Sequence, residues 1–158
     1  MTSFIIAPRP SEPSGRDRIS HLSLAQMVQD VLTTMLELPH ESFQGSPETI
    51  APNQLMAAVR ISGSWQATLQ IYAPEKLARH IACAMFAQAA DVLDDEDVLD
   101  AFGEVVNVIG GNVKGMIDQD CTLSLPCVGA AQPDPTPTSL TIRYDVCGTL
   151  LTVELIQA

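Results

Sequence analysis

Glu104 and Asn107 are the two side chains in this sequence whose types and spacing best suit chemistry at a surface. They are three residues apart, so in a helix both project from the same side. A carboxylate can pair with a cation. An amide oxygen can accept a hydrogen bond from water while the amide nitrogen donates to another oxygen. The pair could therefore bind a charged group and position a water molecule without any covalent step.

One long helix over residues 94–119 is predicted to present this pair. The acidic residues at 94–97 supply an N-cap and favourable charge at the positive end of the helix dipole. Apolar residues recur every three or four positions and predict a buried face made of Phe102, Val105, Val106, Ile109, Val113 and Met116. A second, polar stripe contains Asp100, Glu104, Asn107, Gly111 and Lys114.

Glycines at 103, 110, 111 and 115 all lie inside this predicted helix. Each costs about 1 kcal/mol relative to alanine in a helix interior, so their presence indicates that another backbone or a partner protein comes close. For Gly103, Gly110 and Gly115, tight packing against a sheet is an equally good interpretation. Gly111 falls on the polar stripe, where clearance for a partner is favoured.

The residues around this pair resemble the CheC/CheX/FliY phosphatases of bacterial chemotaxis, and most of all the single-site CheX-like branch. The resemblance extends from about residue 22 to the C-terminus. Its specific part is Asp100, Glu104 and Asn107, then Gly110-Gly111-Asn112, then Leu123-Ser124-Leu125-Pro126. The connection between Asn107 and Pro126 is shorter than in the family pattern, and we expect the shortening to fall around residues 118–121.

The resemblance implies a protein phosphatase, a hydrolase that acts on the phospho-aspartate of a response regulator's receiver domain in two-component signalling. Asn107 would orient the attacking water, and Glu104 would pair with the lysine of the receiver's active site. Asp100, Gly110 and Gly111 would belong to the partner-binding surface. This chain would bind no cofactor, because the receiver would supply Mg2+. The resemblance also implies a homodimer.

Two other functions remain open at this stage. The chain could be a non-catalytic adaptor that docks on a receiver or another signalling protein, although an adaptor has no need of a water-orienting amide. A small-ligand-binding domain has no supporting motif. Two-site members of the family carry a similar triplet on the first helix, but here Thr34 stands where a Glu would be needed, which predicts one site per chain.

Charge and composition exclude several classes of partner. The net charge of -11 argues against nucleic acid and against an anionic membrane surface, since both need Lys and Arg for binding. The four cysteines form no C-x-x-C pair and the histidines are dispersed, so no zinc site is expected. Each cysteine is interpreted as a small buried residue in a reducing compartment. No signal peptide or membrane span is visible, so a cytoplasmic location is expected.

The expected fold is α+β, with two layers: a mostly antiparallel sheet and long helices on one face. Residues 1–20 are predicted to form a flexible arm, and residues 21–158 one domain. The helices are expected at 23–38, capped by Ser23, and at 75–89, where Met85 and Phe86 should face the core. The strands are expected at 55–61, 64–72, 122–125, 139–146 and 149–156, with turns at 62–63 and 147–148. The last strand is long and apolar, so an exposed edge there would need a partner.

Overall fold

The computed structural model describes residues 19–43, 53–117, 120–132 and 137–158 and has the expected α+β fold. Its helical elements are α1 (His21–Asp30), continued by a π-helical turn η2 (Val31–Met35), α2 (Glu75–Phe86) and α3 (Asp95–Met116). Its strands are β1 (His40–Ser42), β2 (Gln54–Gly63), β3 (Ala67–Pro74), β4 (Cys121–Leu123), β5 (Cys127–Ala130), β6 (Leu140–Val146) and β7 (Thr149–Gln157). Residues 1–18, most of the predicted arm, lie outside the described part.

The strands form one sheet in the order β1-β6-β7-β3-β2-β4, in which β5 also pairs with β2. All of these pairings are antiparallel. The two halves of β2 have different neighbours: its end near Gly63 pairs with β4, whereas its beginning pairs with β5. Residues 124–126 join β4 to β5 along this edge, and we call them the edge linker.

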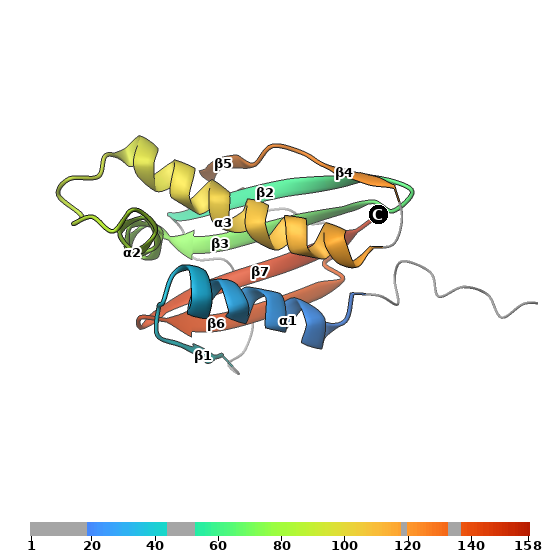
Figure 1. Ribbon diagram of the computed structural model, residues 1–158, viewed down its shortest axis with the longest axis horizontal. Coiled ribbons are helices and arrows are strands. Elements are labelled where there is room, and N and C mark those ends of the chain that lie inside the picture. The colour runs from blue at the N-terminus through green and yellow to red at the C-terminus, as the bar shows by residue number, and fades with distance from the viewer. Residues whose placement is uncertain (1–18, 44–52, 118–119, 133–136) are drawn as a thin grey trace, which may run out of the picture.

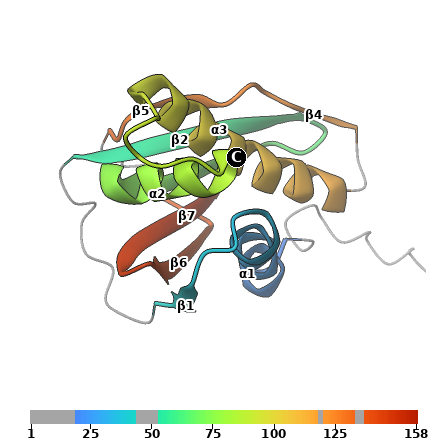
Figure 2. The ribbon, with the colours of Figure 1, turned by 60° about the vertical axis from the view of Figure 1, so that its left-hand side comes forward.

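Helices α1 and α3 lie side by side on one face of the sheet, and α2 lies near the beginning of α3 (Figures 1 and 2). Alternating residues of the strands point into the layer between sheet and helices. Leu69, Ile71 and Val153 come from the sheet, and Leu24, Phe102 and Ile109 come from the helices; all six are at most 1% exposed. This apolar layer is the single core that fixes the position of α3 relative to the sheet.

The helices begin and end differently from the prediction at several points. Ser20, rather than Ser23, is the N-cap of α1, and Ser23 completes the capping box from the third helical position. Phe86 and Met116, each the last residue of its helix, are 40% and 44% exposed instead of buried. A helix's final residue can extend past the sheet, where the helical period no longer predicts burial.

Two strand predictions are also wrong. The turn between β2 and β3 lies at residues 64–66 rather than 62–63, because Ser62 and Gly63 continue β2 to pair with Thr122 and Cys121. Strand β7 is not an edge, since it lies between β6 and β3. The argument that this strand needs a partner therefore fails, and homodimer formation stays a prediction from the resemblance alone.

The cysteines are more exposed than expected. Cys127 and Cys147 are exposed, and Cys83 and Cys121 are half-buried. Cys127 begins β5 at the sheet edge, and Cys147 lies in the β6–β7 turn with a positive φ of 53°. Neither position faces the core.

Candidate active site

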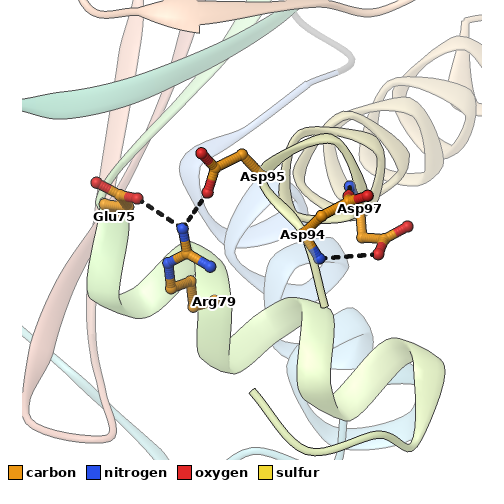
Figure 3. Close-up of polar contacts among 5 residues, drawn as sticks. All are labelled: Glu75, Arg79, Asp94, Asp95 and Asp97. Carbon is orange, nitrogen blue, oxygen red and sulfur yellow. Dashed lines mark hydrogen bonds and ion pairs between the residues drawn. The ribbon is translucent and has the colours of Figure 1, made fainter. Parts of the chain in front are cut away.

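Helix α3 begins with two reciprocal side-chain caps. The Asp94 carboxylate accepts a hydrogen bond from the Asp97 backbone N–H at 2.8 Å, and the Asp97 carboxylate accepts one from the Asp94 N–H at 3.1 Å (Figure 3). Both carboxylates lie at the positive end of the helix dipole. The predicted N-terminus is thereby confirmed, and the caps determine where the first turn of α3 starts.

Arg79 links α2 to this first turn of α3. Its guanidinium donates to the Glu75 carboxylate at 3.0 Å and also to the Asp95 carboxylate (Figure 3). The hydrogen bond to Asp95, followed by the one to Glu75, raises the pKa of Arg79, so the side chain stays charged. The ion pairs are at the surface and screened by solvent, so they orient the helix ends more than they stabilise the fold.

The predicted polar stripe of α3 faces away from the core. Asp100, Glu104 and Gly111 are exposed, and Asn107 is half-buried. Glu104 and Asn107 are separated by about 4.5 Å along the helix axis and by about 60° around it. Within the described residues, neither side chain takes part in a hydrogen bond or an ion pair. Their carboxylate and amide groups are therefore free to contact another molecule.

Gly110 does not belong to this outer surface, which corrects its assignment as a partner contact. It is buried, and a Cβ at this position would lie 2.6 Å from Val59 Cγ2 and 3.2 Å from Leu123 Cδ1. Gly110 therefore allows α3 to approach β2 and β4. By contrast, a Cβ on Gly111 would meet no atom within 4 Å.

Gly103 allows α3 to come close to Pro126, the last residue of the edge linker. A Cβ there would lie 3.0 Å from Val128 Cγ2 and 3.5 Å from both Cβ and Cγ of Pro126. The motif proline is thus placed directly against α3, one helical turn before Asn107. Pro126 is distant from α3 in the sequence, so this contact was not predicted. The sequence motif that ends in Pro126 was the signal that could have indicated it.

The edge linker itself is held firmly to β2. The Ser124 backbone N–H donates to the Arg60 carbonyl at 2.9 Å, and the Arg60 N–H donates to Ser124 Oγ at 2.8 Å. Ser124 Oγ donates in turn to the Leu125 carbonyl at 3.1 Å. These bonds hold the backbone from Ser124 to the Leu125 carbonyl. The Leu125 side chain remains 89% exposed.

The first helical segment has no comparable pair. Thr34 lies in η2, where its hydroxyl donates to the Asp30 carbonyl of its own helix. Among the residues that the structure describes, no three His, Cys, Asp or Glu side chains gather into a group that could hold a metal ion. No helix in the described ranges is long and apolar enough to span a membrane.

The fold and this helix surface define a class of protein: an α+β domain that presents a free carboxylate and a free amide from one long helix. Residues 55–134, just over half of the chain, match the family described as chemotaxis phosphatase CheX. The chain therefore belongs to this family, within the CheC/CheX/FliY group. A search of the curated proteins found no similar sequence.

Solved structures share the fold at low sequence identity. CheX from Vibrio vulnificus has a TM-score of 0.69 and 19% identity, with 89% of this chain and 98% of that chain covered. CheX from Borrelia burgdorferi, solved in complex with CheY, BeF3 and Mg2+, has a TM-score of 0.66 and 18% identity, with 89% and 99% covered. FliY from Thermotoga maritima has a TM-score of 0.61 and 16% identity, with 93% and 91% covered.

Proposed function

We propose that this protein is a phosphatase that hydrolyses the phospho-aspartate of a CheY-like receiver domain. The observation that carries the proposal is the exposed Glu104 beside the unbonded amide of Asn107, on one side of a single helix, in a member of the CheX family. The Borrelia burgdorferi relative was solved with CheY, Mg2+ and BeF3, which stands in for a phosphoryl group. That complex supports a CheY-like receiver as the partner, and in this proposal the receiver supplies the metal ion.

The reaction needs little from this chain except positioning. Water forms a bond to phosphorus while the bond from phosphorus to the aspartate oxygen breaks, giving inorganic phosphate and a free carboxylate. The Asn107 amide oxygen accepts a hydrogen bond from the water, and its nitrogen donates to a neighbouring oxygen. An acyl phosphate is already reactive, so holding water in line can supply most of the acceleration.

Glu104 docks the helix in this proposal. Its carboxylate pairs with the receiver's active-site lysine and so places Asn107 over the phosphoryl group. The exposed Asp100 adds negative charge one turn earlier, and Gly111 leaves room one turn later. The chain's net charge of -11 favours a basic docking patch on the partner. Since receivers of two-component systems act in the cytoplasm, we place this chain there too.

Asn107→Ala tests the proposal, and Asn112→Ala is a matched control. Both asparagines are on α3, but Asn112 points about 140° away around the helix and is exposed. A CheY-like receiver is phosphorylated with a small acyl phosphate, and phosphate release is followed with each variant. We expect Asn107→Ala to slow the catalysed release by about 100-fold and Asn112→Ala to leave it unchanged.

Two outcomes would contradict this assignment. If Asn107→Ala matches the native chain, the amide is not the water-orienting group. If the native chain binds the phosphorylated receiver without accelerating phosphate loss, the protein is an adaptor rather than an enzyme.

A further inference from the structure

The edge linker runs alongside the part of α3 that carries Asn107, an arrangement that the sequence did not predict. Gly103 rests against Pro126, and Gly110 rests against Leu123. Asn107 lies between these two glycines on α3, just as residues 124 and 125 lie between Leu123 and Pro126. Helix and linker therefore run past each other in opposite directions, and Ser124 and Leu125 lie opposite the turn that carries Asn107.

The direction of each side chain around α3 shows from which side a partner reaches the site. Taking 100° per residue, Gly110 lies about 20° to one side of Gly103, and Asn107 lies about 40° to the other side. Glu104 follows a further 60° around. Around α3, Gly110 therefore faces the sheet, Gly103 faces the edge linker and Glu104 faces solvent. A molecule that touches both Asn107 and Glu104 therefore approaches the outer side of α3, and its contact with Asn107 lies on the side nearer the β4–β5 edge.

Leu125 is an exposed side chain on this β4–β5 edge. It is the most exposed of the large apolar side chains in the described residues, at 89%. Leu125 also lines a shallow hollow of about 260 Å3 together with Arg60 and Thr68. It therefore lies where the sheet edge meets the sheet face opposite the helices. A specific interface buries roughly 800 Å2 on each partner, which is a patch about 30 Å across. The edge linker falls inside such a patch when the patch is centred on Asn107.

We propose that Leu125 is an apolar contact of the receiver-docking surface, presented by the edge linker beside Asn107. The inference rests on the proposed function, which supplies the partner. An exposed leucine adds nothing to folding, whereas its hydrogen-bonded backbone holds it ready for contact, so binding costs little ordering entropy. The proposal requires a receiver that carries an apolar patch next to the basic residues that pair with Glu104.

Leu125→Ala and Leu125→Met, with Leu22→Ala as a matched control, test this inference. Leu22 is 78% exposed and lies on α1, the helix beside α3 on the same face of the sheet. With a phosphorylated CheY-like receiver, we expect Leu125→Ala to raise KM by about tenfold and to leave kcat unchanged. Leu125→Met should keep most of the affinity, and Leu22→Ala should behave like the native chain. Thermal unfolding should be unchanged in all three variants, because both leucines are exposed.

The outcomes separate the two proposals. An unchanged KM for Leu125→Ala, in a native chain that accelerates phosphate release, overturns the role of Leu125 and leaves the phosphatase standing. An equal rise in KM for Leu22→Ala overturns it too, since the effect would not be specific to the edge linker. A native chain that neither binds the receiver nor accelerates release overturns both.

Discussion

Gly110 and Val59 approach so closely that a Cβ on Gly110 would lie 2.6 Å from Val59 Cγ2. This is the closest contact that a side chain at any described glycine of α3 would make, and it sets the height of the helix above β2. The polar stripe on the opposite side of α3 is held at a fixed distance from the sheet as a consequence. The helix surface that carries Glu104 and Asn107 is therefore built on this packing contact.

We expect Gly110→Ala to destabilise the fold by about 1–3 kcal/mol, even though alanine favours the helix by about 1 kcal/mol. The branched Val59 side chain is stiff and cannot rotate away easily. Val59→Ala should relieve the overlap, so the double variant should be less destabilised than the sum of the two single variants. Urea denaturation of the four proteins measures this coupling. Strict additivity would show that the two side chains do not compete for space.

Gly111→Ala should have the opposite effect on stability. A Cβ there meets no atom within 4 Å, and the same holds for Gly115, so each substitution should stabilise the chain by up to about 1 kcal/mol. Gly111 is one turn from Asn107, so its alanine variant should also raise the KM for the phosphorylated receiver. Gly115→Ala, a further turn away, is the control and should change stability alone. If the two variants have the same KM, Gly111 gives no clearance to the partner.

Glu104→Lys should weaken binding of the receiver by at least tenfold, because it places a cation opposite the receiver's lysine. The matched control is Glu41→Lys, which makes the same charge change at an exposed position on β1, at the far edge of the sheet. Binding of the receiver in its BeF3-bound, Mg2+-loaded form can be measured by titration calorimetry at two salt concentrations. Equal losses for both variants would indicate general charge attraction rather than an ion pair at Glu104.

Tyr144 should make the fold less stable at alkaline pH. Burial raises the pKa of its hydroxyl above the usual value of 10.0, and this hydroxyl donates to the Ala25 carbonyl of α1 at 3.1 Å. The unfolded chain ionises first as pH rises, so the stabilisation is complete below pH 10 and is lost as pH rises through the raised pKa.

Tyr144→Phe should remove this part of the pH dependence and cost about 1 kcal/mol at neutral pH through the lost hydrogen bond. Urea denaturation from pH 7 to pH 11 compares the two proteins. The same decline in stability for both would place the alkaline sensitivity in other groups.

The sequence alone determined the elements whose pattern is local. The apolar period of α3 and the Asp94 cap predicted the helix and its outer stripe, because both depend on residues within a few turns of each other. The β6–β7 hairpin was predicted for the same reason, since alternation and the Cys147-Gly148 turn are read within one short segment. The placement of Glu104 and Asn107 on one outward side of α3 follows from helix geometry and needed no tertiary information.

The tertiary structure decided whatever depends on partners far away in the chain. β2 continues to Gly63 because β4, nearly sixty residues later, pairs with its end, and no local signal announces that pairing. β7 lies inside the sheet because the strand order does not follow the chain order. In the same way, only packing could assign Gly110 to the sheet and Gly111 to solvent, because adjacent helical residues point about 100° apart and the sheet covers one of those directions.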